Sequence, residues 1–86
     1  MQQPTPDDAA IEAAMRTLVD TRAGRSICPS EVARLLIADE DGWRVLMPRV
    51  REVAQRLARD GHVRLLRKGV VLDPDAPGAG PIRIAG

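Results

Sequence analysis

Three polar side chains in the second half of the chain are spaced to do one kind of chemistry. Arg51, Gln55 and Arg59 recur every fourth residue, so a helix would place them on one face. Arginine can donate two hydrogen bonds to O6 and N7 of guanine, and glutamine can pair with N6 and N7 of adenine. The spacing is therefore typical of a helix that contacts the major groove of DNA. The same residues are ordinary on any solvent-facing helix, and Glu52 beside them would repel phosphate.

The charges of the chain are distributed unevenly. The formal net charge is only +1, yet residues 42–72 carry a net +6 and residues 1–41 a net −4. A basic segment of this kind favours contact with DNA phosphates. The alternative is a solvated basic face, since 12 of the 13 basic residues are arginine, a bias that GC-rich coding also produces. The residues expected to contact phosphates are Arg49, Arg56, Arg64, Arg67 and Lys68.

No set of residues indicates catalysis or a bound cofactor. The chain has one cysteine, Cys28, and one histidine, His62, so it offers neither an intrachain disulfide nor a four-ligand zinc site. It lacks a glycine-rich phosphate loop and a plausible Ser-His-Asp set. We therefore expect no enzyme activity, no cofactor and no metal. Cys28 precedes a predicted helix, where a lowered thiol pKa would permit a redox switch, but a buried core position is the favoured interpretation.

Length and composition indicate one small domain. Residues 1–6 contain two prolines and no apolar anchor, which predicts a disordered tail before a single domain over residues 7–86. No apolar run approaches the roughly 20 residues that span a bilayer, and the polar start does not resemble a signal peptide, so we expect a cytoplasmic protein without membrane contact. Trp43 is the only aromatic residue, which argues against stacking of single-stranded bases and predicts a core position for its ring.

Three helices are expected before the basic hairpin. The first begins at Asp7 or Asp8 and ends near Arg22, because Gly24 permits the left-handed conformation that ends helices. Residues 26–28 predict a very short strand, and a second helix begins at Pro29 or Ser30 and ends before Asp39. Since proline breaks a helix interior, residues 43–47 are expected to form one turn capped by Asp41, and the third helix to run over residues 48–60.

Two β-rich runs follow the third helix. They lie on either side of Lys68-Gly69, which predicts a tight hairpin turn. Residues 73–78 are a loop by composition. The alternation of Ile82 and Ile84 leaves two alternatives open: the run is an exposed edge strand that pairs two copies of the chain, or its two isoleucines dock on the core of the monomer. The order of elements predicts an α+β fold of the winged helix-turn-helix type, with three helices and a small antiparallel sheet.

Five segments together resemble a family of short bacterial proteins classed as a domain of unknown function. These segments are SICPSEVAR (26–34), WRVLMPRVR (43–51), RKG (67–69), LDP (72–74) and GPIRI (80–84). The resemblance spans residues 24–84 and implies a winged-helix fold and a bacterial origin. It supplies no catalytic or ligand-binding residues.

Two functions remain open at this stage. The first is binding of duplex DNA by the third helix and the hairpin, in a sequence-tolerant or sequence-specific manner. The second is a protein-interaction domain in which the same surface binds an acidic partner or a second copy of the chain.

Overall fold

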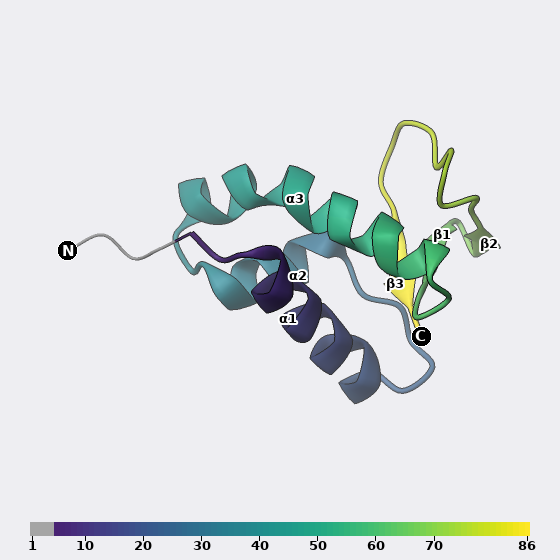
Figure 1. Ribbon diagram of the computed structural model, residues 1–86, viewed down its shortest axis with the longest axis horizontal. Helices are drawn as coiled ribbons and strands as arrows, with labels where there is room; N and C mark the ends of the chain where they lie inside the picture. Colours follow the sequence, from purple (N-terminus) through teal and green to yellow (C-terminus); the bar gives the residue numbers. More distant parts are fainter. Residues whose placement is uncertain (1–4) are drawn as a thin grey trace.

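A computed structural model describes residues 5–86 of the chain (Figure 1). The disordered tail expected over residues 1–6 therefore lies largely outside the described residues. The described part contains three helices and a three-stranded antiparallel sheet, as the sequence predicted. The elements are α1 (Asp8–Thr21), α2 (Pro29–Leu36), α3 (Glu40–Arg59), β1 (Arg64–Arg67), β2 (Val70–Val71) and β3 (Arg83–Ala85).

The first two helices begin and end at the residues expected from capping chemistry. The Asp7 side chain accepts a hydrogen bond of 2.9 Å from the Ala10 amide, which satisfies one free N–H of the first turn of α1. The chain leaves α1 at Arg22, and Gly24 follows with a φ of 85°. Pro29 is the first residue of α2, where its missing N–H costs no hydrogen bond.

The prediction for the third helix was wrong in two respects. Residues 40–59 form one continuous helix with Pro48 inside it, and Asp39 caps the helix by accepting from the Gly42 amide at 2.9 Å. Pro48 lies on the exposed side, and its ring removes a single helical hydrogen bond. The buried positions Leu46 and Val50 lie on either side of it, so the helix continues because both halves bury the same apolar face.

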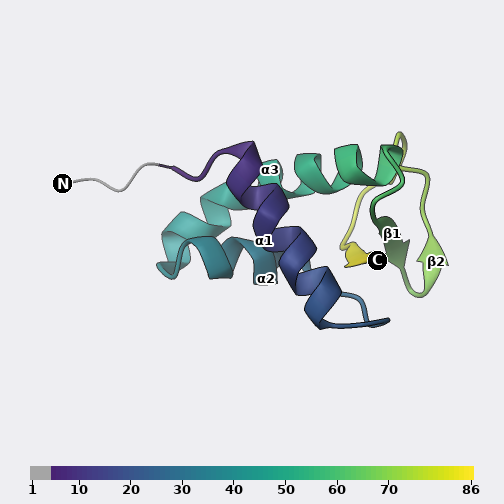
Figure 2. The same ribbon diagram turned by 60° about the horizontal axis from the view of Figure 1, so that its bottom comes forward.

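The sheet lies beyond the C-terminal end of α3 (Figure 2). Its strand order is β2-β1-β3, and the hairpin turn at Lys68 and Gly69 is confirmed. Both turn residues have a positive φ, 52° and 79°, as a type I′ hairpin turn requires. The short strand expected over residues 26–28 is reduced to a single β-bridge between Ile27 and Ile84. Strand β3 therefore pairs with β1 on one side and with Ile27 on the other.

The core is aliphatic and draws on every helix and on the sheet. The Ile82 and Ile84 side chains are 4% and 0% exposed, so of the two alternatives left open for this run the structure supports docking on the core. The helices and sheet form an α+β arrangement compatible with a winged helix. The residues with the largest fully buried side chains are Ile11, Met15, Ile27, Val32, Leu46, Val50, Leu57, Leu65 and Ile84.

The side chain of Trp43 is not fully buried, contrary to the prediction. It is half-buried and packs against the edge of the core. The Arg34 guanidinium carbon lies 4.4 Å from the ring centroid and that of Arg44 lies 5.0 Å from it, so two cations cover the exposed part of the indole. The core closes with aliphatic side chains alone, which leaves the large ring at its rim.

Candidate nucleic-acid interface

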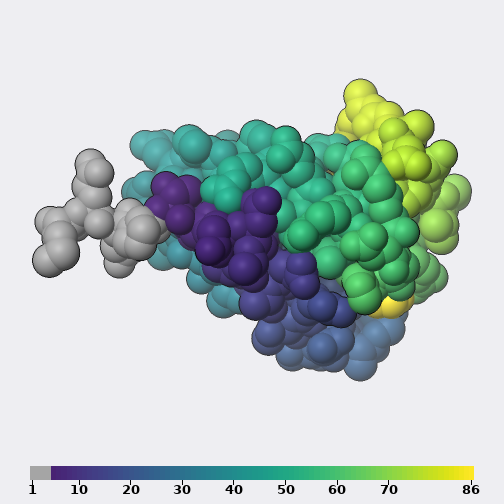
Figure 3. Space-filling view, in the orientation of Figure 1, coloured from purple at the N-terminus to yellow at the C-terminus, as the bar shows by residue number. Residues whose placement is uncertain are grey.

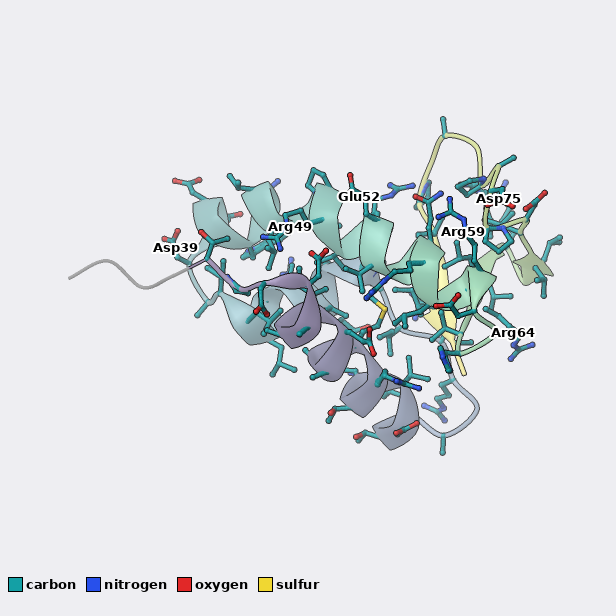
Figure 4. The ribbon with its side chains drawn as sticks, viewed as in Figure 1. Asp39, Arg49, Glu52, Arg59, Arg64 and Asp75 are labelled. Atoms are coloured by element: carbon teal, nitrogen blue, oxygen red, sulfur yellow. The ribbon has the colours of Figure 1, made fainter. Side chains whose placement is uncertain are left out.

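The face of α3 predicted to contact bases is bound by the chain's own β2–β3 loop, residues 72–82. The Gln55 side-chain amide donates to the Pro74 carbonyl at 2.9 Å, and Arg51 donates to the Gly80 carbonyl at 3.0 Å. Arg59 forms an ion pair with Asp75, and both side chains lie on the same side of the helix end (Figure 4). The three side chains do share one face, as their spacing predicted, and they position the loop along it.

Arg67 holds the same loop from the side of the sheet. Its guanidinium donates to the carbonyl oxygens of Pro77 at 2.7 Å, Pro81 at 3.0 Å and Gly80 at 3.3 Å. Because Arg51 also donates to the Gly80 carbonyl, the guanidinium groups of α3 and of β1 meet at one oxygen atom. Gly80 has a φ of 110°, so only glycine fits this bend without strain.

Two of the residues expected to contact phosphates lie instead at the junction of α3 with the N-terminal segment. Arg49 donates to Asp8 and to the Pro6 carbonyl, each at 2.8 Å, and Arg56 donates to Glu12 at 2.8 Å. These pairs join the basic part of the sequence to its acidic part. The charge asymmetry along the sequence is therefore partly neutralised where α1 and α3 meet.

The remaining predicted residues lie on the exposed side of the sheet. Arg64 points away from the helices (Figure 4) and donates to the Gly86 carbonyl at 3.1 Å. Lys68 is exposed at the tip of the hairpin. The structure thus places Arg64 in the first strand of the hairpin and Lys68 at its tip.

Nine of the twelve arginines fall into two groups by their partners. One group forms ion pairs with carboxylates and consists of Arg16, Arg22, Arg44, Arg49, Arg56 and Arg59. The other group donates to neutral acceptors and consists of Arg51, Arg67 and Arg83. Arg64 donates to the backbone oxygen of the last residue, Gly86. The second group keeps its positive charge unbalanced, and it is concentrated around the sheet and the β2–β3 loop. With Lys68, it makes this end of the molecule the more basic one.

A polar cluster that the sequence analysis missed joins β3 to the start of α2. Arg83 donates to the Ser26 hydroxyl at 2.6 Å, to the Ser26 carbonyl at 2.9 Å and to Cys28 Sγ at 2.9 Å. Cys28 is half-buried and caps α2, so its expected core position was wrong. The alternation of Ile82 and Ile84 was the available signal, because it turns Arg83 to the opposite face of the strand.

The same cluster makes the stability of the protein depend on pH. The backbone amide of Cys28 donates to the Glu31 carboxylate at 2.8 Å, and this bond, helped by the Arg22 guanidinium, lowers the pKa of Glu31 below its usual 4.5 against the opposing effect of burial. A carboxyl with a lower pKa in the folded chain stabilises the fold above its unfolded pKa and loses that contribution as the pH falls through the folded value.

We therefore expect the free energy of unfolding to decrease as the pH falls below about 4.5, and Glu31→Gln to remove part of this decrease. Urea unfolding of the two proteins at a series of pH values measures it. Curves of equal pH dependence for the wild-type protein and Glu31→Gln would contradict this expectation.

Among residues 5–86, no three metal-ligating side chains lie close enough together to hold an ion, and no helix is long and apolar enough to cross a membrane. None of the curated proteins compared with the sequence matches it. A family model matches residues 8–86, which include all three helices, the sheet and the β2–β3 loop. With nearly its whole length matched, the chain belongs to the family described as "Protein of unknown function (DUF3253)".

Proposed function

We propose that this protein is a winged-helix domain that binds duplex DNA, mainly through phosphates. The observation that carries the proposal is the meeting of Arg51 from α3 and Arg67 from β1 at the Gly80 carbonyl. Neither guanidinium is paired with a carboxylate in the described part of the chain, and Lys68 extends the basic surface at the hairpin tip. In a winged helix these two elements are the ones that face DNA.

The contacts of the β2–β3 loop favour sequence-tolerant binding. Gln55 is half-buried and its amide already donates to Pro74, while Arg59 is paired with Asp75. Contact of these groups with base edges would require the loop to leave α3. Phosphate contacts need no such rearrangement, since they depend on positive charge close to the backbone of the DNA.

One acidic residue opposes phosphate on the same helix. Glu52 is exposed and points outward from α3, away from the other helices (Figure 4). The β2–β3 loop projects beside the C-terminal half of α3 (Figure 3, yellow-green), so the helix and the loop together form one continuous surface. A duplex laid on this surface would bring phosphate close to Glu52.

Titration of mixed-sequence duplex DNA at several salt concentrations tests the proposal. We expect a log–log slope steeper than about −3, because each phosphate contact contributes about −0.9. Lys68→Asn keeps the positive-φ turn, since asparagine is favoured there, and should weaken binding about threefold and flatten the slope by about 1. Glu52→Gln should strengthen binding by a similar factor at low salt.

Arg25→Gln is the matched control, because it removes one exposed arginine from the connection between α1 and α2. It should change DNA affinity less than the other two variants do. Absence of binding by the wild-type protein at low salt, or equal losses in Lys68→Asn and Arg25→Gln, would refute the proposal. In a bacterial cell, the origin that the family resemblance implies, a DNA-binding role would place the protein in the cytoplasm.

The exposed edge of the sheet favours a second candidate function, binding of a protein partner. Val70 and Val71 form the edge strand β2, and their exposed fractions are 63% and 57%. An unpaired apolar edge can add a strand from another chain. A monomer in sedimentation at tens of micromolar would exclude a second copy of this chain as the partner.

A further inference from the structure

A surface hollow of about 450 Å³ lies between the hairpin turn and β3, on the side of the sheet next to the start of α2. Leu66, Ala79 and Pro81 supply apolar surface to it, and the buried Ile82 and the half-buried Cys28 complete its wall. Small-molecule sites in proteins are concave and mostly apolar, with volumes from roughly 300 to 1,000 Å³. The hollow falls near the lower end of this range, which suits a ligand smaller than a typical drug.

The charged side chains around the hollow are all positive. Arg67, Lys68 and Arg83 line it, and no carboxylate is among its lining residues. Arg67 donates to three backbone carbonyls, and Arg83 donates to two oxygen atoms and a sulfur atom. These acceptors are neutral, and both guanidinium groups lie beside an apolar surface. Glu31, a carboxylate outside the hollow, interacts electrostatically with Arg83, but its ion pair is with Arg22.

Both guanidinium groups also keep donors available. A guanidinium has five N–H groups, and each of these arginines uses three in the contacts above. The contacts to the backbone fix the two side chains in place, so a ligand would not have to order them on binding. Lys68 adds an ammonium group on a flexible stem at the mouth of the hollow.

From this combination we propose that the hollow binds a small organic carboxylate with an apolar body. The apolar body covers Leu66 and Pro81, and the carboxylate lies among Lys68, Arg67 and Arg83. A bare inorganic anion would leave the apolar surface uncovered, and a neutral apolar molecule would leave the positive charges unpaired. Charge and shape thus select an occupant that carries both features.

Three probes of related structure separate these contributions. 1-Naphthoate has the apolar body and the carboxylate, 1-naphthalenemethanol has the same body without charge, and acetate has the charge without the body. Each is titrated into the wild-type protein, with the backbone amide signals of Gly69, Gly80 and Arg83 followed by NMR. We expect naphthoate to bind at least about tenfold more tightly than either of the other two, equivalent to about 1.4 kcal/mol.

Two variants and a control locate the site. Lys68→Asn and Arg83→Gln each remove one charge from the hollow and should each weaken naphthoate binding about threefold to tenfold. Arg64→Gln removes one charge from the same sheet outside the hollow and should leave binding unchanged. If Arg83→Gln fails to fold, Lys68→Asn alone decides, because the type I′ turn accepts asparagine.

Three results would overturn the proposal. The first is equal affinity for naphthoate and the alcohol. The second is that chemical-shift changes are confined to amides outside the hollow. The third is that no amide signal shifts at about 10 mM naphthoate, a concentration well above the dissociation constant of a specific small-molecule site. The measurement involves no DNA, so its outcome is independent of the proposed function.

Discussion

Replacing Ile84 with alanine is expected to cost about 3–5 kcal/mol of stability and to leave most of the protein unfolded at 37 °C. The Ile84 side chain is 0% exposed, and its strand β3 pairs with Leu65 of β1 on one side and with the single bridge residue Ile27 on the other. Its backbone exchanges two hydrogen bonds of 2.8 Å with Ile27, so the strand stays in place and the lost side chain leaves a cavity. Far-ultraviolet circular dichroism during urea unfolding measures the change.

Ile84→Val removes one methylene group and should cost about 0.5–1.5 kcal/mol, a loss small enough to be measured in a protein that remains folded. Val71→Ala is the matched control in the same sheet, since Val71 is 57% exposed, and its cost should stay below about 1 kcal/mol. Similar losses for Ile84→Ala and Val71→Ala would show that the C-terminal run does not form part of the core.

Replacing Arg67 with methionine is expected to release the β2–β3 loop and to lower global stability by about 1–3 kcal/mol. Methionine keeps much of the apolar stem but removes the donors to Pro77, Gly80 and Pro81, and leaves these carbonyls without that partner. The local effect should exceed the global one, because the loop has few other fixed contacts with the sheet. Exchange of the Asp75 and Ala76 amides should accelerate at least about tenfold.

Hydrogen exchange followed by NMR measures the release, and the side-chain amide of Gln55 supplies a second signal because its bond to Pro74 depends on the same loop. Arg64→Met is the matched control. It lies on the same strand but donates to one carbonyl outside the loop, so loop exchange should not change. Unchanged exchange in Arg67→Met would mean that α3 alone holds the loop.

Arg67 and Gln55 also decide which surface the protein presents. Gln55 holds the β2–β3 loop from the side of α3, and Arg67 holds it from the side of the sheet. Together they keep the loop over the face of α3 that would contact bases in a DNA groove. A released loop would free the Gln55 amide and the Arg51 guanidinium for other partners. If the proposed function is correct, Arg67→Met should therefore bind DNA with altered sequence preference as well as altered affinity.

The local structure of this protein was largely predictable from its sequence. Asp7 and Pro29 marked the starts of two helices, and Lys68-Gly69 marked the turn, since caps and turns depend on a few adjacent residues. The buried face of α3 was visible in the spacing of its apolar residues. The predicted helix boundary at Pro48 was wrong because the prediction counted only the lost helical hydrogen bond. Burial of Leu46 and Val50 on either side of Pro48 stabilises the continuous helix, and this burial exists only in the packed core.

The arrangement of the charged side chains was decided by tertiary structure alone. Arg49 and Arg56 were expected at a DNA surface, yet their partners lie in α1 or just before it, more than forty residues earlier. Arg83 and Cys28 meet although 55 residues separate them. A long charged side chain has no fixed partner in a sequence pattern, since its flexible stem lets it bond with whatever acceptor the fold brings near. The sequence by itself therefore determined the helices, the turn and the apolar core, whereas packing decided which arginines are neutralised and which remain available to bind an anion.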